Sequence, residues 1–99
     1  MVFDISKISG IGKFTSRMEE VKEQPRTLYL KDEKVFLVEN KNTIELRTDE
    51  ELRKLLVEKY ESVMESRYFG RGGVEIVVAG HQFSDAELED LIRLSYNLS

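Results

Sequence analysis

Residues 43–60, "TIELRTDEELRKLLVEKY", contain a change of hydrophobic period that decides the class of fold. In "TIELRT" (43–48), Ile44 and Leu46 alternate with Glu45 and Arg47. A period of two residues is typical of a half-buried strand, so we expect the two apolar side chains to point inward and the two charged ones outward. The segment therefore predicts a strand with one covered face.

The same stretch then predicts a helix over residues 49–61. Its apolar residues recur at spacings of three and four, which places them on one helical face: Leu52, Leu55, Leu56, Tyr60 and Val63. Thr48 and Glu51 fit the capping box T-x-x-E, in which a hydroxyl and a carboxylate satisfy the first free amides of a helix. We therefore expect Thr48 to be the N-cap.

Downstream, "VEIVVAG" (74–80) is rich in β-branched residues and predicts a strand. Ser84 and Glu87 form a second capping box, S-x-x-E, before a run with helical spacing that reaches the C-terminus. The C-terminal segment therefore predicts a strand followed by an amphipathic helix.

Upstream, "RTLYLK" (26–31) and "VFLVEN" (35–40) predict two more strands, joined by the polar turn "KDEK". Short polar links between strands indicate an antiparallel meander. Before them, Phe14, Met18 and Val21 recur at spacings of four and three, which predicts a helix over 13–23 that Pro25 ends.

Together these elements predict one α+β domain over residues 1–99, in the order α-β-β-β-α-β-α. We expect a two-layer sandwich, in which helices cover one face of a four-stranded, mainly antiparallel sheet.

Composition narrows the possible functions. The chain has 99 residues, a net charge of −4, one histidine (His81) and no cysteine. Thiol catalysis, cysteine-ligated zinc and disulfides are excluded, and a lone histidine gives little basis for a metal site or a nucleophile–base pair. We expect no enzyme, no metal and no cofactor. With no secretory signal and no apolar run of the roughly 20 residues that a membrane span needs, we expect a cytoplasmic protein without a membrane partner.

The least ordinary segment is "SRYFGRGG" (66–73), which lies between the predicted second helix and the strand over 74–80. Arg67 and Arg71 offer paired donors for a phosphate or carboxylate, and the amides of Gly70, Gly72 and Gly73 could form an anion-binding nest. A structural interpretation stays open: the glycines permit positive φ and a bulge, while the neighbouring aromatic pair plugs the edge of the core.

Residues 34–99 also resemble the MmcQ/YjbR family. The resemblance is carried by Lys34 and Phe36 in a strand and by the run D-x-x-L-x-x-L-I-x-x-S-Y, which ends at Ser95 and Tyr96. Family members place a polar or basic stretch ending in tryptophan where this chain has "SRYFGRGG", and this chain has no tryptophan. The resemblance implies a compact α+β fold, described as a double wing and suggested to bind DNA.

These observations lead to two functional hypotheses for a small non-enzymatic binding domain. In the first, nucleic acid binds the sheet edge and the loop over 66–73 through Arg67, Gly70, Arg71, Gly72 and Gly73, with Lys31, Lys34 and Lys41 from the strand turns. The acidic residues concentrate in the predicted helices, which favours the sheet side for a polyanion. The alternative is a protein-interaction or homodimerisation module that binds no nucleic acid.

Overall fold

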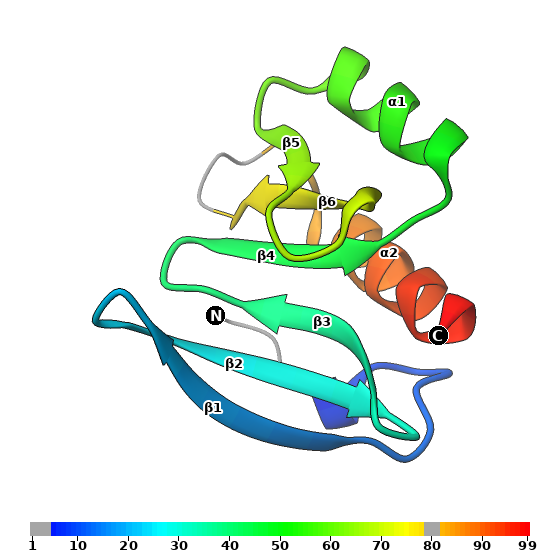
Figure 1. The fold of residues 1–99 in the computed structure, drawn as a ribbon. Coiled ribbons are helices and arrows are strands. Elements are labelled where there is room, and N and C mark those ends of the chain that lie inside the picture. Colours follow the sequence, from blue (N-terminus) through cyan, green and yellow to red (C-terminus); the bar gives the residue numbers. More distant parts are fainter. Residues whose placement is uncertain (1–4, 79–81) are drawn as a thin grey trace.

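The computed structural model describes residues 5–78 and 82–99. Within them, one antiparallel sheet has the strand order β1-β2-β3-β4-β6-β5 (Figure 1). The elements, in chain order, are η1 (Ile5–Lys7), β1 (Thr15–Val21), β2 (Gln24–Lys31), β3 (Lys34–Glu39), β4 (Thr43–Arg47), α1 (Glu50–Lys59), β5 (Val63–Ser66), β6 (Gly70–Val77) and α2 (Asp85–Leu98). The α+β class is confirmed, but the prediction of four strands was wrong: the sheet has six.

The predicted helix over 13–23 was wrong, because this segment forms β1 and pairs along its whole length with β2. Its helical spacing buries little, since Met18 remains 72% exposed. Lys22 and Glu23, both with positive φ, form a two-residue turn whose twist suits a hairpin. Pro25 therefore lies inside β2 opposite Glu20, beyond the last residue of β2 that pairs with β3.

The second missed strand is β5, which the sequence assigned to the end of a helix and a loop. It pairs with β6 in a hairpin whose register shifts at Glu65 and Ser66, so "SRYFGRGG" is mostly the connection and the first part of β6. The predicted strand over 74–80 is confirmed up to Val77; residues 79–81, including His81, lie outside the described part of the chain.

The N-cap predicted from the sequence is correct for α2 but not for α1. Ser84 and Glu87 form the predicted capping box at the start of α2. At α1, however, the N-cap is Asp49, whose carboxylate accepts from the amide of Leu52. Thr48 lies one residue earlier, with its hydroxyl buried and without a hydrogen-bond partner. A carboxylate is a better N-cap than threonine, which accounts for the shift of one residue.

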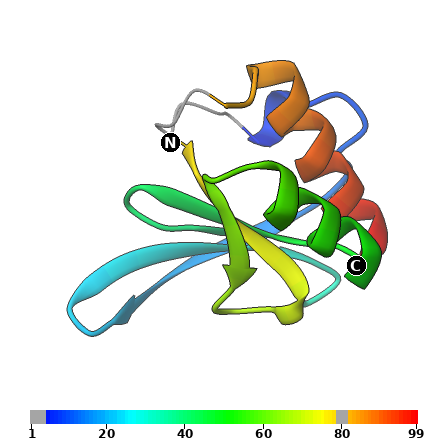
Figure 2. The same ribbon diagram turned by 90° about the horizontal axis from the view of Figure 1, so that it is seen from above.

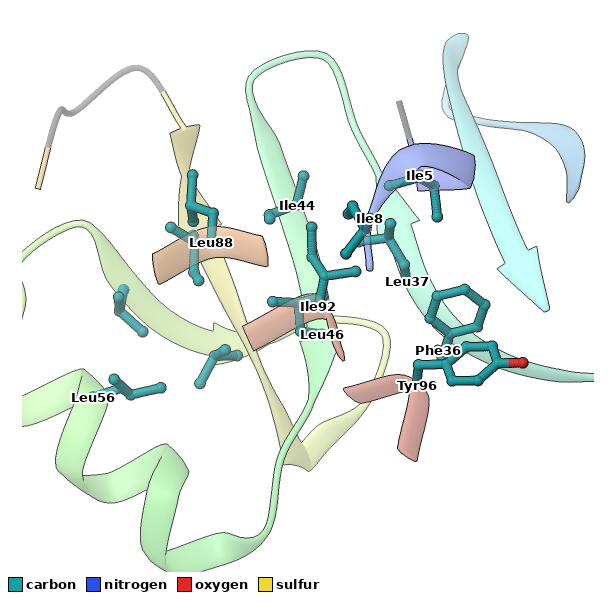
Figure 3. Packing of buried hydrophobic residues seen from close by; sticks show 13 residues of the cluster. Ile5, Ile8, Phe36, Leu37, Ile44, Leu46, Leu56, Leu88, Ile92 and Tyr96 are labelled. Carbon is teal, nitrogen blue, oxygen red and sulfur yellow. The ribbon is translucent and has the colours of Figure 1, made fainter. Parts of the chain in front are cut away.

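Both helices lie on one face of the sheet (Figure 2), where they share a hydrophobic cluster with the strands and η1 (Figure 3). In that cluster α1 supplies Leu56 and α2 supplies Leu88, Ile92 and Tyr96, against Ile44 and Leu46 of β4 and Val74 and Ile76 of β6. The opposite face has a smaller cluster of Leu28, Leu30, Val35 and Val38, against which Phe69 packs. Buried hydrophobic residues therefore lie on both faces of the sheet, although the helices cover only one.

A β-bulge in β3 lets one strand serve both clusters. Tyr29 pairs with Leu37 but Leu30 pairs with Val35, which leaves Phe36 as an extra residue. Phe36 joins the helix-side cluster next to Leu37, whereas Val35 belongs to the opposite one. The hydroxyl of Ser95 donates to the carbonyl of Phe36 and accepts from the amide of Arg47, which ties α2 to the strands at the bulge.

Candidate functional site

The connection between β5 and β6 holds Arg67 over the face of the sheet opposite the helices. Its guanidinium donates from Nε and a terminal nitrogen to the two carboxylate oxygens of Glu75, at 2.9 and 2.8 Å. The carboxylate side chain is only 3% exposed, whereas that of Arg67 is 73% exposed. These hydrogen bonds and the charge of Glu75 raise the pKa of Arg67 above its usual value. A buried carboxylate therefore holds an exposed guanidinium in one orientation.

Glu45 lies beside Glu75, because the two residues are directly paired on β4 and β6. Both are almost fully buried. Glu45 accepts hydrogen bonds from the amide of Asn40, the hydroxyl of Ser66 and the backbone N–H of Tyr68, while Thr43 donates to Glu75. Buried carboxylates are tolerated where donors of this kind replace water.

The three glycines of the predicted nest have structural roles. Gly70 has a φ of +61°, which other residues adopt only with strain. A side chain on Gly73 would meet the carbonyl of Leu46 at 2.4 Å. The N–H of Gly72 is bonded to the carbonyl of Phe69, and its own carbonyl accepts from Thr48. Backbone conformation and close packing therefore explain these glycines, and an anion-binding nest is not needed to account for them.

Two aromatic side chains cover the sheet next to the carboxylates. Phe69 packs against the second hydrophobic cluster, with the guanidinium of Arg47 4.9 Å from its ring centre. Tyr68, 38% exposed, contacts Phe69 edge-on and has the guanidinium of Arg26 5.2 Å from its ring centre. Stacking of cations on these rings fixes the connection between β5 and β6 against the strands.

An open cleft of about 530 Å³ lies between this connection, the tip of the β1–β2 hairpin and the β3–β4 turn. The residues that line it include four basic ones together with Tyr68 and Glu45. The basic side chains are Lys22, Arg26, Lys41 and Arg67. We call this feature the basic cleft.

The four cations of the basic cleft are not equally available. Arg67 is paired with Glu75, and Arg26 is paired with Glu19 across the hairpin. Within the described part of the chain, neither Lys22 nor Lys41 has a carboxylate within ion-pair distance. The two lysines without a carboxylate at ion-pair distance therefore lie at the two turns that border the cleft.

The remaining predicted site residues lie elsewhere. Arg71 is exposed on β6 and its carbonyl accepts from Arg53 of α1, so it does not join Arg67 in the cleft. Lys34 follows the turn at the other end of β2, opposite Lys31. Of the eight residues predicted to bind, Arg67 and Lys41 line the basic cleft. Lys22 and Arg26 were missed because a hairpin brings them there, and no local motif indicates that contact.

Two negative findings apply to residues 5–78 and 82–99. They contain no cluster of three or more histidine, cysteine or acidic residues that could hold a metal ion. None of their helices is both long and apolar enough to cross a membrane.

Comparison of the chain with protein-family models, with curated proteins and with solved structures gave no match.

Proposed function

We propose that this chain is a small non-enzymatic domain that binds nucleic acid in the basic cleft. The observation that carries the proposal is the grouping of Lys22, Lys41 and Arg67 around an exposed tyrosine ring in an open cleft. Proteins that bind single-stranded nucleic acid usually combine basic side chains that contact the phosphate backbone with an aromatic ring on which a base stacks. A resemblance to the MmcQ/YjbR family agrees with this proposal.

The size of the cleft favours a single strand over a duplex. A volume of about 530 Å³ lies in the range of sites that enclose one small-molecule-sized group, such as a nucleotide. A double helix would contact only the mouth of the cleft. We therefore expect one flexible nucleotide to enter while its flanking phosphates meet Lys22 and Lys41.

Arg67 contributes orientation more than charge. A guanidinium has five N–H donors, and Glu75 takes two of them. The others are available to a phosphate or a base edge at the exposed end of the side chain. Because Glu75 balances the charge, we expect most of the salt dependence of binding to come from the two lysines.

The test is binding of labelled single-stranded and duplex oligonucleotides, followed by fluorescence anisotropy at several salt concentrations. We expect the double variant Lys22→Ala/Lys41→Ala to bind more weakly than the wild type and with a shallower salt dependence. For a single strand, each lost phosphate contact makes the negative slope of log K against log salt shallower by about 0.7.

The matched control is Lys34→Ala/Lys54→Ala, which removes the same charge at positions away from the cleft. It should retain most of the affinity and nearly the wild-type slope. Absence of binding at low salt would contradict the proposal, as would equal losses in the cleft variant and the control. Tighter binding of duplex than of single strand would contradict the expectation from cleft size.

A further inference from the structure

We propose that a second copy of this chain binds along β1, so that two sheets join through their β1 edges about a two-fold axis at Met18. β1 is an edge strand of seven residues with six of its side chains exposed. It contains no proline and no bulge, and such an edge presents unpaired backbone groups to any partner strand. This inference is independent of the proposed nucleic-acid binding.

The hairpin register shows which backbone groups are free. In a two-residue hairpin the residues beside the turn, here Val21 and Gln24, form a hydrogen-bonded pair, and pairs then alternate along the ladder. The N–H and C=O groups of Ser16, Met18 and Glu20 therefore point away from β2. In the described ranges, none of these groups bonds to backbone outside the strand.

One antiparallel register satisfies all of these groups. When Met18 lies opposite Met18 of the second copy, Ser16 lies opposite Glu20, and every outward N–H meets an outward C=O. A shift by two residues leaves one residue of each strand without a partner. A self-complementary contact of this kind is what a two-fold dimer requires.

The side chains agree with the same register. Arg17 then lies opposite Glu19 of the second copy at the closely spaced, non-hydrogen-bonded pairs, so opposite charges meet twice. In the described part of the chain Arg17 has no carboxylate at ion-pair distance. On the other face of the strand the two Met18 side chains, each 72% exposed in the monomer, cover one another.

A single cysteine tests the register, because the chain has none of its own. In a hydrogen-bonded antiparallel pair the Cα atoms lie about 5.5 Å apart, which suits a disulfide. Under mild oxidation we expect Met18→Cys to form covalent dimers quickly. The control is Met64→Cys on β5, the opposite edge of the sheet, where the exposed fraction is 43%. Cross-linking of Met18→Cys no faster than this control would overturn the proposal.

Charge reversal tests the same contact without covalent chemistry. Arg17→Glu would place like charges opposite each other at both pairs, and we expect it to raise the dimer dissociation constant about tenfold or more in sedimentation velocity runs. Lys54→Glu on α1 changes the net charge equally and should leave the constant unchanged. A wild-type chain that remains monomeric up to about 100 μM, or equal effects of the two variants, would overturn the proposal.

Discussion

On the face of the sheet that carries the helices, Ile44 and Ile76 are paired and belong to the hydrophobic cluster that the sheet shares with the helices; on the opposite face of the same strands, Glu45 and Glu75 lie side by side. All four residues are at most 2% exposed. One face is buried by hydrophobic contact, which needs only suitable size. The other is buried by hydrogen bonds that each need a donor in the right place. Two faces that are equally buried can therefore differ in how much stability a substitution costs.

The largest effect should come from the helix-covered face. Phe36 is fully buried, and its ring meets that of Tyr96 edge-on at 5.0 Å. We expect Phe36→Ala to lower the free energy of unfolding by about 3–5 kcal/mol, measured by urea denaturation. Val38→Ala, on the other face of the same strand, removes fewer buried carbons and should cost about 1.5–2 kcal/mol. If both variants lost the same unfolding free energy, the expectation that the helix-side cluster contributes more would be wrong.

An intermediate effect should come from the ion pair. We expect Arg67→Ala to cost about 1–2 kcal/mol, less than for a fully buried pair because water reaches the exposed guanidinium. The reason for the cost is that Glu75 stays buried without its counter-charge. In a double-mutant cycle with Glu75→Gln, the coupling should be at least about 0.5 kcal/mol.

The neighbouring arginine supplies the control for that cycle. Arg71 lies in the same hairpin and is exposed, and no carboxylate within the described residues is at ion-pair distance. Arg71→Ala should therefore change stability by less than about 0.5 kcal/mol. If it costs as much as Arg67→Ala, the effect belongs to the hairpin and not to the pair with Glu75.

The smallest effect should appear in the pH dependence. Hydrogen bonds from the backbone and hydroxyl of Ser84 lower the pKa of Glu87 at the start of α2. A carboxyl whose pKa is lower in the folded state stabilises above its unfolded pKa, and the contribution is lost as the pH falls through the folded value. Between about pH 5 and pH 3, Glu87→Gln should therefore lose less stability than the wild type. Parallel curves of unfolding free energy against pH for the two proteins would contradict this. The pH dependence that remains in the variant comes from the other acidic residues.

The sequence predicted the elements that have a covered face. β3, β4 and β6 are short runs of mostly buried residues with strong strand formers, and α2 carries a helical spacing that matches its buried side. The two missed strands, β1 and β5, are the two edges of the sheet. An edge strand that buries few side chains has little reason to alternate, and its pairing depends on its neighbour. In the absence of alternation, the chance spacing of Met18 and Val21 suggested a helix.

The site was harder to predict than the fold. Alternation placed Glu45 on the face opposite Ile44 correctly, but it could not show that this face is itself covered. The cover comes from Tyr68 and Phe69, which are more than 20 positions away in sequence from Glu45. The basic cleft likewise joins three turns that only the completed sheet brings together. Arg67 was found because two arginines among glycines form an unusual local pattern.

The hydroxyl of Ser95 has a consequence for the order in which the chain folds. Continuing the register of Leu37 with Leu46 would pair Phe36 with Arg47, and the serine hydroxyl bridges these two backbone groups instead. On the ribosome, Phe36 and Arg47 are made well before residue 95, so this rung stays hydrated while the rest of the β3–β4 ribbon can already form. Closing it is among the last steps of biosynthetic folding, and the arrival of α2 completes the sheet.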